Sequence, residues 1–158
     1  MSTRIKRGAL PGLLAVVAIL VGAGCLAADS GAEATGSRIS VSDAYVPEPP
    51  GDVAAAYLQI SNEGDGGDTL LSVRSDASRL AELHETVMDG ASVSMRPVDA
   101  LTIPGGQTVA LEPGGFHVML IDPVAPLEEG GQVRLVHTFE AAGEVEVLAD
   151  VVATGGPR

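Results

Sequence analysis

The sequence predicts an all-β sandwich. Short runs rich in Val, Ile, Leu and Tyr recur about every ten residues, and clusters of Gly, Pro, Asn and Asp separate them. No stretch has a capped apolar helical stripe, and only residues 76–87 leave the choice between strand and helix open. The chain has four aromatic residues, 2 Tyr and 2 Phe, so we expect a core of Val, Leu, Ile and Ala.

The N-terminal residues 1–24 predict an export signal that is not part of the sandwich. Three basic residues come first, and an apolar run over residues 9–23 follows them. This is the order of the charged and apolar regions of a secretory signal, and the run is short for a membrane span. We therefore expect this segment to be removed and the remaining domain to be extracytoplasmic.

Cys25 is the only cysteine of the chain, and it follows the apolar run directly. Its surroundings resemble a lipoprotein signal, in which the cysteine becomes the lipidated first residue and anchors the chain to the membrane. Gly22 stands where that pattern usually has leucine. The alternative is ordinary cleavage after Ala27 or Ala28, which discards Cys25. In either case no disulfide supports the domain, so its core must carry the stability.

Acidic residues dominate the chain after the signal. Without residues 1–24 the chain has 6 basic residues, all Arg, against 21 Asp and Glu, a net charge of −15. Such a chain is not expected to bind nucleic acid or anionic lipid by electrostatic attraction. We interpret the acidic residues as a solvated surface, with a field that concentrates cations as the alternative.

A tether and then the strands follow along the chain. Residues 25–38 are small and polar without periodicity, and they predict a flexible tether. The domain is expected over residues 39–154, because alternation begins with Ile39 and Val41. The predicted strands lie within residues 38–46, 53–62, 69–75, 79–88, 91–98, 132–140 and 144–153, with two more short strands between residues 101 and 123.

The segment HETVMDGASVSM contains the first pair of candidate metal ligands. Asp-Gly between two strand-like runs predicts a tight hairpin, because both residues tolerate positive φ. If Asp89 and Gly90 form a two-residue turn, His84 lies directly opposite Met95. Directly opposed residues share one face, with Cβ atoms about 4.5–5.5 Å apart. The predicted turn therefore places an imidazole beside a thioether.

His117 and Met119 form a second pair. Residues i and i+2 project from one face of a strand about 6.5–7 Å apart, so both can reach one ion if the strand bends. If the two segments meet, two histidines and two methionines complete a four-coordinate site. Thioether sulfur is soft and favours Cu(I) over Mg, Ca or Mn, whereas zinc sites use His, Cys and carboxylates. The set His84, Met95, His117 and Met119 therefore predicts a Cu(I) site, although imidazole also serves Cu(II).

The other histidine and methionine of the domain are interpreted as structural. His137 alternates with apolar residues in QVRLVHTFE, so we expect it to be half-buried and not a ligand. Met88 shares a face with His84 but lies about 13 Å away along the strand, and it is assigned to packing. Each candidate ligand taken singly is more typical of structure than of metal binding. The combination indicates a site, because two pairs account for four of the six His and Met residues after the signal.

The residues argue against two further classes of protein. A blue-copper electron carrier needs a cysteine thiolate with two histidines, and Cys25 belongs to the signal or the anchor. An enzyme is not expected, because no Ser/His/Asp order, carboxylate pair or phosphate-binding loop stands out. A metal-free β-sandwich lipoprotein with a scaffold or adhesion role is the alternative to a copper-binding protein.

The ligand spacing resembles that of the PCuAC family of periplasmic copper chaperones. The four candidate ligands fit the family pattern H-x10-M-x21-H-x-M, and blocks such as AAAYLQISNEG, ELHETVMDG and ALEPGGFHVMLID resemble family blocks over about residues 39–152. Some members have methionine directly after the first histidine, where this chain has Glu85, so an auxiliary soft ligand is missing. The resemblance implies a cupredoxin-like, immunoglobulin-like β-sandwich that binds Cu(I) at an exposed edge. It also implies copper transfer to a partner such as a cytochrome oxidase subunit or its assembly factor.

Overall fold

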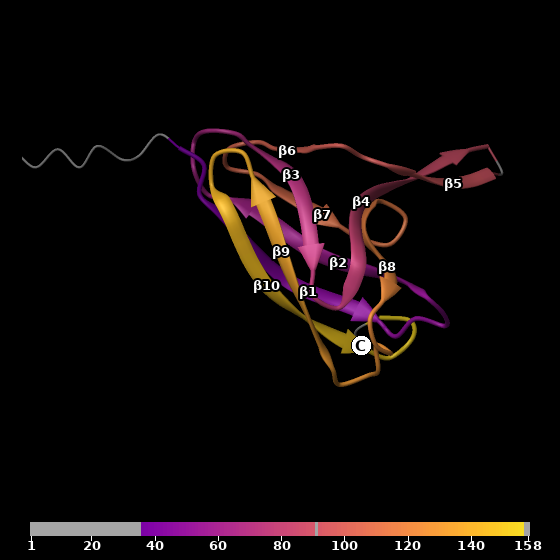
Figure 1. Cartoon of the computed structure of the whole chain (residues 1–158). Helices are drawn as coiled ribbons and strands as arrows, with labels where there is room; N and C mark the ends of the chain where they lie inside the picture. Colours follow the sequence, from indigo (N-terminus) through magenta and orange to yellow (C-terminus); the bar gives the residue numbers. More distant parts are fainter. Residues whose placement is uncertain (1–35, 91, 157–158) are drawn as a thin grey trace, which may run out of the picture. The chain divides into compact units, whose positions relative to one another are not determined.

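The computed structural model describes residues 36–90 and 92–156, and the predicted signal and Cys25 lie outside this part. The described part contains ten strands and no helix, and so no helix that could cross a membrane (Figure 1). The predicted all-β class is confirmed. The strands are β1 (Ile39–Pro47), β2 (Val53–Asn62), β3 (Asp68–Ser75), β4 (Ser78–Asp89), β5 (Ser92–Pro97), β6 (Leu101–Ile103), β7 (Thr108–Leu111), β8 (Phe116–Pro123), β9 (Gln132–Phe139) and β10 (Gly143–Val152).

The region between residues 101 and 123 forms three strands, β6, β7 and β8, where two were predicted. Two Pro-Gly-Gly turns separate them. Gly106 and Gly114 in these turns have φ of 68° and 85°, a left-handed conformation that glycine adopts without strain. Residues 76–87, for which the sequence did not decide between strand and helix, lie mostly in β4.

The strands form two sheets that share β2. The hydrogen-bonded order is β5-β4-β8-β2-β1-β10-β9-β3-β6, and β7 also pairs with β2. Residues 53–56 of β2 pair with β8 and residues 58–61 pair with β7. The smaller sheet, β5-β4-β8-β2, therefore branches from the larger one within β2. The loop between β7 and β8 lies at this branch and leads directly into His117.

The hydrophobic core is built from aliphatic side chains. Ile60, Leu120 and Leu135, from β2, β8 and β9, are completely buried. The core contains no methionine from the described residues. All of these strands and the core they enclose lie within residues 36–156, so this part meets the requirements of an independently folding domain.

The β4–β5 hairpin extends away from the other strands, and β5 pairs with β4 alone (Figure 1). Its register differs from the predicted one by two residues along β5. Asp89 pairs with Ser92, and His84 is opposite Pro97 instead of Met95. The predicted direct opposition of His84 and Met95 is therefore wrong. A shift of two residues nevertheless keeps both side chains on one face, because side chains alternate with a period of two.

Glycine at position 90 permits the observed hairpin register. Gly90 is the first residue of the loop and has φ of 61°. A type II′ turn has glycine at this position, and such turns match the twist of hairpin strands as well as the predicted Asp-Gly type I′ turn does. Asp89 can therefore leave the loop and join the strand ladder.

Candidate metal centre

The outer face of the smaller sheet brings the two predicted His/Met pairs together. His84 on β4 is directly opposite His117 on β8, and their ring centroids are 6.1 Å apart. Met119 follows His117 on the same face of β8, opposite Glu82. Met95 on β5 is diagonal to His84, which separates the two backbones by about 7–8 Å. Three adjacent strands thus carry the four side chains.

The imidazole of His117 is oriented by the loop between β7 and β8. Its Nδ1 lies 3.1 Å from the carbonyl oxygen of Gly115. Because a carbonyl only accepts hydrogen bonds, Nδ1 donates and the neutral ring carries its lone pair on Nε2. Nε2 is buried and has no hydrogen-bond partner. The same carbonyl accepts the N–H of Thr86 at 3.0 Å, which ties the loop to β4.

The imidazole of His84 is oriented by a carboxylate on its own strand. Its Nε2 lies 3.1 Å from Oε2 of Glu82, two residues earlier on the same face of β4. The carboxylate accepts, so Nε2 donates and the lone pair of the neutral ring lies on Nδ1. This Nδ1 is also buried without a hydrogen-bond partner. Each ring is therefore held by one nitrogen and presents a free lone pair on the other, an arrangement typical of metal-binding histidines.

A cavity of about 190 Å³ lies beside these rings. Its lining includes Met95, His117 and Met119, together with Tyr57. Tyr57 helps to enclose His117, with the two ring centroids 6.4 Å apart, and His117 is only 3% exposed. Met95 is 60% exposed, so the cavity is open on the hairpin side. His84 is not part of the lining and adjoins the cavity through His117.

The unpartnered histidine nitrogens stand out from the other buried polar atoms. Within residues 36–90 and 92–156, every buried side-chain nitrogen or oxygen without a partner belongs to a histidine. The buried amide of Asn62, by contrast, makes four hydrogen bonds. Nearly all buried polar atoms in proteins are hydrogen-bonded, so His84 Nδ1 and His117 Nε2 are typical of a ligand site. No cluster of three His, Cys, Asp or Glu that could hold a metal occurs in the same residues.

Met88, Glu85 and His137 were also considered from the sequence, and the structure now places each of them. Met88 is 73% exposed, so its assignment to packing is wrong. Glu85 lies on the opposite face of β4 from His84 and forms an ion pair with Arg96 at 2.8 Å. The position where some family members have methionine therefore points away from the candidate site. His137 is completely buried on β9, more deeply than the half-buried position expected.

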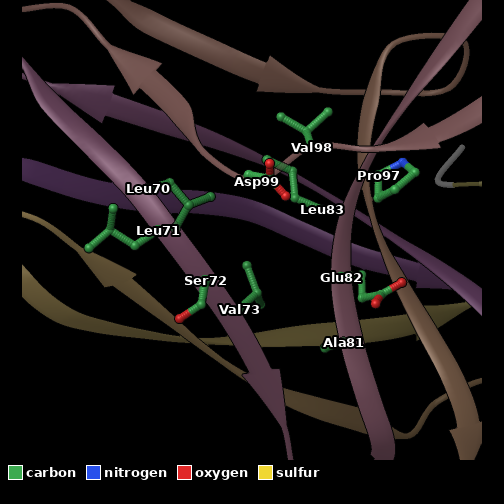
Figure 2. Close-up of a pocket in the computed structure, with 10 residues that line it drawn as sticks. All are labelled: Leu70, Leu71, Ser72, Val73, Ala81, Glu82, Leu83, Pro97, Val98 and Asp99. Atoms are coloured by element: carbon green, nitrogen blue, oxygen red, sulfur yellow. The ribbon is translucent and has the colours of Figure 1, made fainter.

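Two other cavities in the described part of the chain lack soft donors. A cavity of about 210 Å³ lies between β3 and β4, and none of its lining residues is His, Cys or Met (Figure 2). Figure 2 shows Leu83 and Glu82 leaving β4 on opposite sides, with the carboxylate of Glu82 toward β8. A hollow of about 490 Å³ between the loops of residues 48–52 and 123–128 is lined mainly by Pro, Glu and aliphatic residues. Neither can offer a site for a soft metal.

Sequence reasoning missed the two groups that orient the histidines. Glu82 and Gly115 each stand two residues before their histidine, and neither was identified as a partner. For Glu82 a signal existed, because a residue at i−2 shares the face of a strand. For Gly115 the contact is through the backbone, which side-chain patterns do not report.

Known proteins resemble this chain in sequence and in structure. The family model described as "Putative lipoprotein LpqE-like" matches residues 39–151. "Putative lipoprotein Lxx21020" of Leifsonia xyli subsp. xyli is 35% identical over 144 residues, 86% of each chain. The solved copper-bound PCuAC domain from PmoF2 is 28% identical with a TM-score of 0.62, over 75% of this chain and 95% of that one. The solution structure of CuI-DR1885 from Deinococcus radiodurans is 27% identical with a TM-score of 0.59, over 84% and 89% of the two chains.

These matches agree with the sequence blocks that predicted the family and with the observed strands. The family model covers nearly all of the described strands, from the start of β1 to the end of β10. The solved relatives have the cupredoxin-like β-sandwich predicted here. The chain therefore belongs to the LpqE-like lipoprotein family and has the fold of the PCuAC domains.

Proposed function

We propose that this chain is a copper chaperone that acts outside the cytoplasm. It holds one Cu(I) with Nδ1 of His84, Nε2 of His117 and the sulfur atoms of Met95 and Met119, and it passes the ion to a partner protein. One observation carries the proposal: the buried, unpartnered Nε2 of His117 lies at a cavity lined by two thioethers, and His84, with its own unpartnered Nδ1, is directly opposite His117. Solved relatives described as copper-bound and as a Cu(I) form give independent support.

The donor set suits cargo that must be released. Thioethers are uncharged and soft, and they bind Cu(I) in preference to harder ions. Each imidazole is held through one ring nitrogen, so the other nitrogen can donate its lone pair to the ion. Met95 is largely exposed, so an incoming ligand from a partner can reach the ion from the hairpin side. The site therefore favours stepwise exchange of ligands.

The partner is expected to be a copper-accepting protein, such as a cytochrome oxidase subunit or its assembly factor. Residues 1–24 are removed as an export signal, and lipidation of Cys25 keeps the domain at the membrane, in keeping with the lipoprotein name of the family. The chain acts by binding and transfer, not as an enzyme, and it does not bind nucleic acid.

The test is a Cu(I) titration of residues 26–158 against a chromophoric chelator without oxygen, followed by X-ray absorption on the loaded protein. We expect one Cu(I) per chain with two nitrogen and two sulfur neighbours. The variant His137→Leu should give the same stoichiometry and neighbours. Absence of a defined stoichiometry, which the metal-free scaffold alternative requires, or a spectrum without copper–sulfur scattering would overturn the proposal.

A further inference from the structure

Every methionine in the described part of the chain lies on one face of the smaller sheet. Met119, Met95 and Met88 are opposite Glu82, Thr86 and Val93 in the strand ladders. Residues 82, 84, 86 and 88 of β4 share a face, because side chains alternate along a strand. Methionine commonly fills protein cores, yet this core contains none. The three methionines instead lie on β8, on β5 and at the end of β4 near the hairpin turn, on the face that also carries His84 and His117.

Packing does not account for Met88. Its side chain is 73% exposed on a hairpin that extends from the sandwich, and its cross-strand neighbour Val93 is 62% exposed (Figure 1). A side chain this exposed gains little from the hydrophobic effect. Met88 therefore differs from an ordinary exposed apolar residue in its soft sulfur atom. It is the methionine nearest the hairpin turn, and it is the most exposed of the three.

Met95 stands between Met88 and His84. On β5 it is two residues from Val93, which faces Met88, and two residues from Pro97, which faces His84. Met95 is thus diagonal to both, with backbones about 7–8 Å apart in each case. Methionine has three rotatable side-chain bonds, so the sulfur of Met95 can turn toward either neighbour.

We propose that Met88 and Met95 form an outer Cu(I) site through which copper enters and leaves the inner site. This inference rests on the proposed function. Cu(I) first binds both thioethers while the copper donor's own ligand, or water, completes its coordination. The sulfur of Met95 then stays bound while the copper–sulfur bond to Met88 breaks. The bond to the donor's ligand or to water also breaks, and bonds to His84 Nδ1, His117 Nε2 and the sulfur of Met119 form in place of the bonds that are lost.

This exchange is balanced without any other reactant. Copper remains Cu(I), and the exchange only replaces one set of copper ligands by another. Two thioethers hold copper more weakly than two thioethers with two imidazoles, so the ion moves inward. A partner that offers stronger ligands at the hairpin draws it out by the reverse path.

The test measures the rate of copper exchange separately from the affinity of the inner site. Residues 26–158 are mixed with a Cu(I)–chelator complex without oxygen in a stopped-flow instrument, and equilibrium competition is measured with the same chelator. Met88→Leu removes the sulfur and keeps the volume. We expect it to slow uptake and release about tenfold and to change the equilibrium affinity less than about twofold. Val93→Ala, which trims the apolar residue opposite Met88, should leave the rates unchanged.

The outcomes separate this inference from the proposed function. Wild-type protein that binds one Cu(I), with unchanged rates in Met88→Leu, overturns the outer site alone. Equal slowing in Val93→Ala also overturns it, because the effect then comes from apolar contact and not from sulfur. Wild-type protein that binds no Cu(I) overturns both. As a direct readout, the ¹³C-labelled methyl resonance of Met88 should shift when Cu(I) is added to the double variant His84→Leu with His117→Leu, in which the inner site cannot compete for Met95, and an unmoved resonance contradicts the outer site.

Discussion

The cavity beside β8 and the core around β9 each bury a histidine with an unpartnered ring nitrogen. His117 is 3% exposed and His137 is completely buried. At β8 the Gly115 carbonyl holds one ring nitrogen, and the other lies beside a cavity lined by two thioethers. At β9 the ring of His137 stacks on Phe139, with centroids 6.5 Å apart, and it lines none of the three cavities described above.

The difference shows that an unpartnered nitrogen alone does not make a ligand. A metal-binding histidine needs a fixed tautomer and further donors of matching softness within reach. His137 has neither, and desolvation lowers its pKa to about 4, with a contact to the backbone of Val145 offsetting only part of this. It is therefore a neutral group in the core. The same substitution should thus have opposite consequences at the two positions.

The largest effect is expected when both nitrogen ligands are removed. In the double variant His84→Leu with His117→Leu, Cu(I) affinity should fall at least about ten-thousandfold, if each lost nitrogen costs about a hundredfold. His137→Leu should leave the affinity within about twofold. Competition with a chromophoric chelator measures both. Comparable losses in the two proteins would remove the distinction between the two regions.

The next effect concerns the stability of the fold, and it tests whether His137 is a neutral group buried in the core. Its pKa falls from 6.5 to about 4 on folding, so between these pH values the unfolded chain binds a proton that the folded chain does not. Stability therefore falls as the pH falls through this range, by about 3 kcal/mol in total. Above pH 6.5 the ring is neutral in both states and contributes no pH dependence.

Urea denaturation of the metal-free protein at pH 7 and at pH 4.5 measures this loss. His137→Leu is the control, because it keeps the core filled and removes the titrating group. We expect the variant to lose less stability than the wild type on acidification and to be at least as stable at pH 7, since two unpartnered nitrogens are removed. The same acid-induced loss in both proteins would contradict the assignment.

Period and turn chemistry predicted most of the fold, and the failures have physical causes. Alternation at Ile39 and Val41 correctly located β1. β6 has only three residues, too few for a period to be recognised, so it was merged with its neighbour. Period-two patterns also cannot separate half burial from full burial, which is why the depth of His137 was underestimated.

The gathering of the four candidate ligands on one face of adjacent strands could be predicted from the sequence, whereas their contacts could not. A hairpin slip of one residue would have moved Met95 to the other face, whereas the observed slip of two keeps it on the face of His84. The apolar pattern is identical for both registers, and glycine at position 90 suits either turn. The proposed ligands therefore still share one face despite the wrong register. The predicted direct opposition of His84 and Met95 is not observed. The role of Glu82 was indicated only by its position two residues before His84 on the same face, and the role of Gly115 is a backbone contact that side-chain patterns do not report.

A smaller effect is expected from replacing sulfur without changing volume. Met119→Leu should lower Cu(I) affinity about tenfold to a hundredfold, because leucine fills the same space but donates no electron pair. X-ray absorption should count one sulfur neighbour instead of two. The converse variant, Leu135→Met, places a thioether two residues from His137 and so reproduces the His/Met spacing of β8. It should create no second Cu(I) site, and a new site there would show that spacing alone is sufficient.

The smallest effect is expected from the carboxylate that orients His84. Glu82→Leu removes the acceptor of the His84 Nε2 proton, so the ring can rotate or exchange tautomers and no longer keeps its lone pair fixed on Nδ1. Cu(I) affinity should fall about tenfold. Glu82→Gln keeps an acceptor oxygen and should cost less. Equilibrium competition measures both variants.

Glu85→Leu is the matched control for this change. Glu85 is a carboxylate on the same strand, three residues along, but it lies on the opposite face and pairs with Arg96. Losing such a partly exposed ion pair costs about 0–1 kcal/mol of stability, and it should leave Cu(I) affinity unchanged. If the two variants lowered affinity equally, the effect would be one of net charge on the ion. A loss confined to Glu82 would mean that the hydrogen bond to the ring, which His137 lacks, is what makes a buried histidine available to copper.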